Sequence, residues 1–470
     1  MERRVIVPLI VAVALVMQNL DSTALVTSLP LIAESLGEPT LRMHMAVTGY
    51  MLSFACFLPL SGWMADRFGA RLIFRIAMAI FTIGSVLCGS SRTFEELILC
   101  RVLQGLGGAM MVPVGRLILV RSVPKSELVA AMALMGMPTL IGPVVGPVLG
   151  GFIATVSSWR WIFWMNVPVG ILGIVLATRF IDDVREDNVR PFDWKGFFLS
   201  GFGLAGTLFG MDTVIAKNSF DPIALGAFFG GLIALALYVF HARRADHPIL
   251  DLKLLKIATF RSSVTGGSIF RLGIGANPFL LPLMLQEGFG YSPVHSGIVT
   301  CASAAGAFGM RTVARRVLRK FGFRRVLVWN SLVASLFLAL CGLFQPTTPQ
   351  AIMMGVIFFG GLFRSLEFTA LSAIAFADVE SRMMSHATSF QQMAQRLSMS
   401  FGVALSAFFL HQLSPDPAHV PVSAFQITFV LIGLLSATSV WTFARLSPDA
   451  GAAMAGRTPV ERARSRAFHG

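Results

Sequence analysis

Apolar runs about 20 residues long recur along the whole chain, and they limit its possible folds more than any other feature. A helix needs about 20 apolar residues to cross roughly 30 Å of hydrocarbon, and within lipid only helices and closed barrels satisfy their own backbone hydrogen bonds. Runs of this length predict an all-α membrane protein. The fourteen expected spans are approximately 5–32, 43–64, 72–90, 96–120, 127–155, 160–181, 195–214, 222–242, 262–285, 294–314, 325–344, 350–376, 385–411 and 423–444.

Composition supports this class. The chain has 470 residues, of which 55% are apolar and 13% charged, whereas a soluble domain has about 45–50% and about 25%. The first run is too long for a removable signal peptide, and it contains Asp21. The five cysteines are scattered without a CxxC pair, so we expect neither a disulfide framework nor a metal site.

The positive charges orient the spans. With the N-terminus inside, 29 of the 38 lysines and arginines lie in inner segments, 4 in outer segments and 5 within spans. Cytoplasmic loops carry the excess of Lys and Arg, so both termini are expected in the cytoplasm and the number of spans is even. Because topology explains the net charge of +14, the expected partner is the lipid bilayer and not nucleic acid.

An internal repeat divides the chain. DRFGARLIF at 66–74 and RKFGFRRVL at 319–327 each lie in an inner loop two spans into a six-span set. Spans 1–6 and 9–14 are therefore expected to be parallel repeats, a transporter design with the substrate path between the halves. The segment 245–261 is read either as a short surface helix or as a plain connection. The expected parts are a six-helix bundle at 1–181, two inserted helices with linkers at 182–261, a second bundle at 262–445 and a disordered tail at 446–470.

Asp21 is anomalous because a carboxylate costs roughly 2.5–3.5 kcal/mol at the centre of a membrane helix. Asp21 lies about ten residues below the outer end of span 1, and Arg101 about five residues below that of span 4. These depths, ~15 Å and ~8 Å at 1.5 Å per residue, allow the arginine to reach the acid. The alternative is a structural acid held by hydrogen bonds from Ser22 or Thr23.

Glycine patterns in the first half indicate close helix contacts. Gly105 and Gly108 give span 4 a smooth face. In GPVVGPVLGG (142–151), glycines and prolines each recur every four residues, which predicts a bent helix suited to a sliding seam between the halves. Ordinary tight packing is the alternative. In GWMADRFGAR (62–71), Gly62 and Gly69 are expected to permit close approach and a turn, and Asp66 to form either a conformational latch or part of a static turn.

Four more ionisable residues lie within later spans. Arg271 and Arg396 are expected near the midplane, where charges usually face an aqueous cavity. Arg364 and Glu367 are three residues apart on one span, so we expect them to pair. Two remaining arginines would favour an anionic substrate. The alternative is that they only hold helices together.

With these motifs in view, the sequence resembles the major facilitator superfamily and, within it, the fourteen-span drug:proton antiporters. LDSTALVTSLP (20–30) resembles that family's first-span motif, GWMADRFGAR its loop motif, RVLQG (101–105) its fourth-span motif and GPVVGPVLGG its fifth-span motif. Thr27 and Ser28 depart from the usual Asn-x-Ala, which leaves the substrate range open.

The resemblance implies proton-driven export by alternating access in a bacterial inner membrane, without a cofactor, by a monomer. Asp21 and Arg101 would couple protons. The expected substrate cavity contains Gln18, Gln104, Arg271, Arg364, Glu367 and Arg396. The expected cytoplasmic gate consists of Gly62, Asp66, Arg67, Gly69 and Arg71. The expected seam consists of Gly142, Pro143, Gly146, Pro147, Gly150 and Gly151.

Two other functions remain at this point. One is proton-coupled export of a small organic anion such as a carboxylate, and the other is a receptor-like relative that does not transport. An enzyme is not expected, because the chain contains no GxxxxGK[ST] phosphate loop, no HExxH and no Cys/His cluster.

Overall fold

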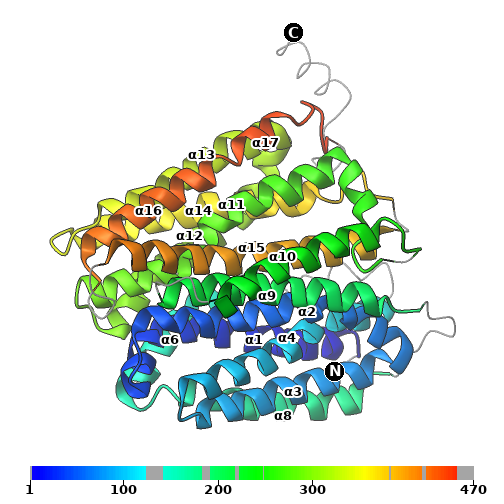
Figure 1. Ribbon diagram of the computed structural model, residues 1–470, viewed down its shortest axis with the longest axis horizontal. Coiled ribbons are helices and arrows are strands. Elements are labelled where there is room, and N and C mark those ends of the chain that lie inside the picture. The colour runs from blue at the N-terminus through cyan, green and yellow to red at the C-terminus, as the bar shows by residue number, and fades with distance from the viewer. Residues whose placement is uncertain are drawn as a thin grey trace. The chain divides into compact units, whose positions relative to one another are not determined.

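A computed structural model describes residues 3–122, 141–182, 191–217, 222–246, 248–380, 383–414 and 420–452. Helices account for the regular structure of these residues, and no strand occurs among them (Figure 1). The chain forms two compact units. Unit 1 comprises Met1–Tyr238 with Leu285–Cys301, and unit 2 comprises Val239–Met284 with Ala302–Gly470.

Unit 1 contains the first half of the chain. Its helices are α1 (Arg3–Leu36), η1 (Thr40–Met43), α2 (His44–Phe68), α3 (Ala70–Ser90), α4 (Phe94–Ser122), α6 (Ile141–Val156), α7 (Trp161–Trp164), α8 (Asn166–Phe180), α9 (Trp194–Lys217) and most of α10 (Pro222–Ala242). The π-turn η4 (Met284–Gly288) and the start of α12 (Pro293–Phe321) also belong largely to it. Figure 1 shows α3 and α8 side by side in this unit, as their packing requires.

Unit 2 contains the second half. Its helices are η3 (Leu252–Lys256), α11 (Ala258–Leu283), the rest of α12, α13 (Phe323–Leu340), η5 (Cys341–Leu343), α14 (Gln350–Ile374), α15 (Met384–Leu413), α16 (Val422–Ala437) and α17 (Val440–Ala444). The described residues between α10 and α11 include the 3₁₀ turn η3, at whose start the Asp251 carboxylate accepts a hydrogen bond from the Lys253 amide.

The two units repeat one packing scheme. The first helix packs on the fifth in both units, as α1 on α6 and α11 on α15. The third packs on the fourth and the sixth, as α3 on α4 and α8, and α13 on α14 and α16. Both loops of the repeated sequence turn at a glycine with positive φ, 95° at Gly69 and 78° at Gly322, a conformation that disfavours other residues.

The predicted membrane architecture is confirmed. Eleven of the described helices are long and apolar enough to cross a bilayer. The helices α6, α9 and α12 lie at the other three predicted spans, so each of the fourteen spans corresponds to a long helix. The protein is therefore a multi-pass membrane protein. The first part of the fifth span (127–140) and tail residues 453–470 lie outside the described residues, and the four-part division of the chain stays a prediction.

Candidate functional site

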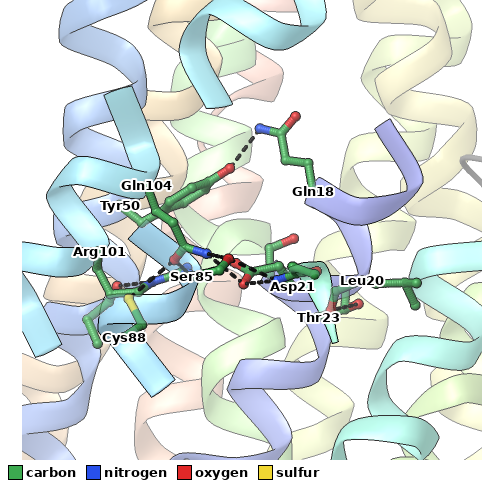
Figure 2. A network of polar contacts seen from close by, with 12 residues as sticks. Gln18, Leu20, Asp21, Thr23, Tyr50, Ser85, Cys88, Arg101 and Gln104 are labelled. Carbon is green, nitrogen blue, oxygen red and sulfur yellow. Dashed lines mark hydrogen bonds and ion pairs between the residues drawn. The ribbon is translucent and has the colours of Figure 1, made fainter. Parts of the chain in front are cut away.

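The predicted contact between Asp21 and Arg101 is the centre of a polar network inside unit 1 (Figure 2). Arg101 Nη1 lies 2.6 Å from Asp21 Oδ2, which joins α4 to α1. Both side chains are buried, with exposed fractions of 1% for Arg101 and 0% for Asp21. Because charges removed from water require partners, each residue makes the other tolerable inside the bundle.

Neutral side chains complete the surroundings of the carboxylate. Gln104 Nε2 and Asn166 Nδ2 each donate to Asp21 Oδ1 at 3.0 Å. Ser85 Oγ accepts from the same two groups, at 2.6 Å from Gln104 and 3.2 Å from Asn166. The Asp21 carboxylate thus has three donors from two helices of the repeat, α4 and α8, and Ser85 on α3 holds two of them in place.

Arg101 is itself held on several sides. Its Nε donates to the Ala46 carbonyl at 3.2 Å, and its Nη1 donates to Gln104 Oε1 at 2.6 Å. Its Cζ lies 4.5 Å from the centroid of the Tyr50 ring, a cation–π distance. Tyr50 Oη in turn accepts from Gln18 Nε2 at 2.7 Å. Gln18, expected in the substrate cavity, is therefore linked to the arginine through one aromatic ring.

The alternative partners proposed for Asp21 are wrong. Ser22 Oγ and Thr23 Oγ1 both donate to the Asn19 carbonyl, at 3.1 and 2.7 Å. Hydroxyls in a helix satisfy themselves on the carbonyl three or four residues earlier, which leaves the carboxylate to other helices. The residues that the sequence did not point to are Ser85, Asn166 and Tyr50. The only signal for Asn166 was an amide inside an otherwise apolar span.

The glycines predicted to shape the seam lie against α1 and the start of α12. A methyl group at Gly142 would lie 2.5 Å from Asn19 Cβ, and one at Gly150 would lie 2.6 Å from Ala24 Cα. On another face of α6, a methyl group at Gly151 would meet the Pro293 carbonyl carbon at 2.6 Å. Gly146 meets Thr23 in the same way, Pro147 packs on Gly297, and Pro143 lies where the side chain is not described.

Hydroxyl groups tie α1 to α6 along this contact. Thr23 Oγ1 lies 3.1 Å from the Gly142 carbonyl, and Ser28 Oγ lies 3.1 Å from the Gly150 carbonyl. Ser28 is one of the two residues that depart from the family motif. Its hydroxyl therefore contributes to helix packing, since it is fully buried and directed at a backbone oxygen.

The expected gate residues lie at the end of α2 and the start of α3. Gly69 makes the turn, and Arg71 Nη1 donates to the Ile181 carbonyl at 3.3 Å, which joins α3 to the end of α8. Arg67 is exposed and Asp66 is half-buried. The expected close approach at Gly62 is wrong, because a methyl group there would have no atom of the described residues within 4 Å.

The predicted pair of Arg364 and Glu367 is also wrong. Arg364 Nη2 donates to Ser303 Oγ on α12 at 2.8 Å, and Glu367 Oε2 accepts from Asn330 Nδ2 on α13 at 2.8 Å. Two residues three apart on a helix share a side only approximately, and here each has a nearer partner on another helix. Arg271 is fully buried, whereas Arg396 is half-buried on α15.

Comparison with known proteins places the chain among transporters. A family model described as "Major Facilitator Superfamily" matches residues 11–258 and 263–468. The chain is 38% identical over 452 residues to the "Putative multidrug resistance protein MdtD" of Serratia proteamaculans, covering 94% of this chain and 93% of that protein. The protein of the same name from Yersinia pestis is 39% identical, covering 94% and 96%. The resemblance of residues 17–30 and 103–116 to proteins of this MdtD type thus extends over 94% of the chain.

Solved structures agree on the fold. A POT family transporter in complex with 5-aminolevulinic acid aligns with a TM-score of 0.69 at 13% identity, covering 93% of this chain and 94% of that chain. A D-xylose-proton symporter aligns with a TM-score of 0.67 at 11% identity, covering 95% and 98%. At such identities, the likeness concerns the helical architecture alone.

Proposed function

The chain belongs to the major facilitator superfamily, so it is a membrane transporter and not an enzyme, and we propose that it exports small molecules in exchange for protons. The observation that carries the proposal is the fully buried Asp21 carboxylate in contact with Arg101. An ionisable group within a membrane segment usually serves an ion or substrate path. In unit 1, the Asp21 carboxylate has one charged donor, Arg101, and two neutral donors, Gln104 and Asn166.

The proposed coupling follows from the two forms of the carboxyl group. Contact with the Arg101 guanidinium favours the carboxylate, and burial without that contact favours the neutral acid. A proton that binds Oδ2 removes the charge that holds Arg101, while Gln104 and Asn166 still bind Oδ1. Protonation of Asp21 therefore weakens the link between α1 and α4, and release of the proton restores this link.

This link is well placed to act on the rest of unit 1. The same helix α1 packs through Thr23 and Ala24 on the smooth face of α6. When Arg101 is released, α1 could slide along the glycine face of α6, since glycines have no side chains that interlock. Alternating access in this proposal couples the proton state of Asp21 to the α1–α6 contact.

The first candidate substrate class is a range of drugs, because the relatives at 38–39% identity are named multidrug resistance proteins. A second class, small organic anions, is favoured by one observation in unit 2. Arg364 lines a small cavity of about 20 Å³ together with Ser303 and Asn277, whose Oδ1 has no hydrogen-bond partner among the described residues. A cavity of this size holds about one water molecule, so the guanidinium and its polar neighbours would bind a carboxylate only in a state of the transport cycle in which the cavity is wider.

Export driven by proton entry requires a membrane with a proton gradient. We place the protein in the bacterial inner membrane with both termini in the cytoplasm, because the excess of Lys and Arg lies in the segments then inside. On this topology the Asp21 network lies in the outer half of the bilayer and the Gly69 turn at the cytoplasmic face.

The central test is Asp21→Asn in everted vesicles. The amide keeps the shape of the side chain but cannot exchange a proton, so proton-driven movement of the transported probe should fall to the background of empty vesicles. Ethidium serves as the cationic probe and benzoate as the carboxylate probe, and the wild type decides which substrate class is carried.

Glu95→Gln is the matched control, because Glu95 is an exposed acid on α4, and it should leave exchange unchanged. Membrane content of each variant is measured by immunoblot. Normal proton exchange by Asp21→Asn at normal abundance would show that Asp21 is not the coupling group.

A further inference from the structure

Glu367 is a buried acid in unit 2 that has only half of its partners. Its exposed fraction is 0%, and Oε2 accepts from Asn330 Nδ2 at 2.8 Å. Oε1 has no hydrogen-bond partner among the described residues. A carboxylate oxygen buried without a donor is strongly disfavoured, whereas a neutral carboxyl group in the same place is disfavoured far less.

Arg271 is the complementary group. It is also fully buried, and none of its three guanidinium nitrogens has a hydrogen-bond partner within the described residues. Its Cζ lies 5.7 Å from the centroid of the Phe368 ring, next to Glu367 on α14. The helices of Arg271 and Glu367, α11 and α14, pack on each other, and no hydrogen bond joins the two side chains.

Among the described groups around Glu367, we take Arg271 as the charged partner, for the following reasons. From α13, Asn330 contributes a neutral amide that also donates to the Phe363 carbonyl at 2.8 Å. Arg364, one turn earlier on α14, is turned toward Ser303 of α12. From α11, which packs on α14, Arg271 contributes a positive charge beside Phe368, the residue that follows Glu367.

The arrangement is that of the Asp21 network with the charges exchanged. In unit 1 the acid is on the first helix of the repeat and the arginine on the fourth, α1 and α4. In unit 2 the arginine is on the first helix and the acid on the fourth, α11 and α14. On these equivalent helices, each unit therefore has a fully buried acid and a fully buried arginine, which are bonded in unit 1 and not bonded in unit 2.

We propose that Glu367 is a second proton-binding site, which alternates between a neutral carboxyl group and a direct ion pair with Arg271. The described geometry is that of the neutral form, since the guanidinium does not bind Oε1. When the Glu367 proton leaves to water, the carboxylate formed takes the free donors of Arg271 and draws α14 toward α11. This inference deepens the proposed function and rests on it, because it assigns a second proton to the same transport cycle.

The two sites lie at opposite ends of their helices. Arg101 is seven residues after the start of α4, and Glu367 is seven residues before the end of α14. Seven residues correspond to ~10 Å. With the proposed topology, the Asp21 site lies near the outer face and the Glu367 site near the inner face. The proposal thus gives each half of the bilayer one buried proton site.

The test is a pH titration of the purified full chain in liposomes, followed by infrared difference spectroscopy of the carbonyl stretch of buried protonated carboxyl groups. The wild type should show two such groups that titrate. Glu367→Gln should lose one, Asp21→Asn should lose the other, and Glu95→Gln should keep both. Two unchanged titrating groups in Glu367→Gln would overturn the proposal.

A second measurement uses a variant that retains Glu367. It therefore tests the proton site even if Glu367→Gln does not fold. In Arg271→Gln the band of Glu367 should persist to higher pH, because the positive charge that favours the carboxylate is absent. The exchanged double variant Arg271→Glu with Glu367→Arg should regain a titrating acid, since it copies the order of charges in unit 1. A band in Arg271→Gln that titrates as in the wild type would contradict the ion pair.

Transport assays in vesicles distinguish the loss of the Glu367 proton from the loss of all proton coupling. In vesicles with a pH difference of about one unit, loss of one coupled proton should lower the steady-state gradient of the transported probe about tenfold. Glu367→Gln should retain this weaker proton-driven movement, whereas Asp21→Asn should abolish it. If wild-type vesicles move no probe with protons, the proposed function fails, while the infrared titration still reports on the Glu367 site.

Discussion

Asn166 has a role in the Asp21 network that differs from that of the arginine. It donates to the same carboxylate oxygen as Gln104, and both amides are braced by Ser85. An amide can serve a charged or a neutral carboxyl group, since it remains a donor in either case. In the proposed mechanism, Asn166 therefore fixes the position of Asp21 while Arg101 responds to its charge.

Replacing Asn166 by leucine should destabilise the protein by roughly 1–3 kcal/mol, because a buried charged acceptor loses a donor. The apparent Tm of the purified protein, measured by intrinsic fluorescence, should fall. Thr178→Val is the control, since Thr178 is an exposed residue on the same helix, α8, that bonds only to the Ile174 carbonyl in its own helix. Equal Tm values for the two variants would show that Asn166 does not support the network.

Single residues differ in how far they could be predicted. Asp21 and Arg101 were found because charges stand out in apolar runs and their depths follow from span counting. Asn166 and Ser85 were missed because a neutral polar residue in a span is common, and its partner is set by packing between helices. The Arg364–Glu367 pair was predicted from spacing on one helix, and Ser303 on another helix formed the closer contact.

At the scale of elements, the contact between α1 and α6 depends on the absence of side chains. Three glycines four residues apart bring the two backbones together, and hydroxyls from α1 bond to carbonyls of α6. Helices approach this closely in membranes only where small residues line the interface. The regular spacing in the sequence was enough to predict the face but not the helices that it meets.

Gly150→Ala should weaken proton-driven efflux and lower stability by about 1–3 kcal/mol, because its methyl group would overlap Ala24 and push α6 away from α1. Gly230→Ala on α10 is the matched control, since a methyl group there has no atom of the described residues within 4 Å. In that exposed helix, alanine should be neutral or stabilising by up to about 1 kcal/mol. Similar efflux and Tm in the two variants would argue that the α1–α6 contact tolerates separation.

At the scale of the molecule, the fourteen spans were predictable because hydrophobic length is a local property that lipid imposes on each segment separately. The repeat was predictable from one short loop sequence, and its two glycines adopt the positive φ that the loop requires. The boundaries of the compact units were less accessible to sequence reasoning. The start of α12 belongs to unit 1 although it is the tenth span in order.

The orientation of the whole chain in the membrane can be tested with reporter fusions. Alkaline phosphatase fused at residue 217, in an expected outer loop, should be active in intact cells, and fusions at residue 256 or after the last residue should be inactive. A fluorescent protein fused at these positions should give the opposite pattern, because it folds on the cytoplasmic side. An active phosphatase at the C-terminus would contradict the orientation deduced from the basic residues.

The first and fourth helices of a unit are made at different times, and this gives the Asp21–Arg101 contact a consequence during synthesis. The two residues are 80 positions apart. At about 5–20 residues per second, the ribosome needs roughly 4–16 s to add Arg101 after Asp21. During that interval the nascent first helix carries an acid whose counter-charge does not yet exist, so it must remain near water or bind a proton until the fourth helix arrives. The order of translation therefore makes α4 the helix that allows α1 to settle in the bilayer.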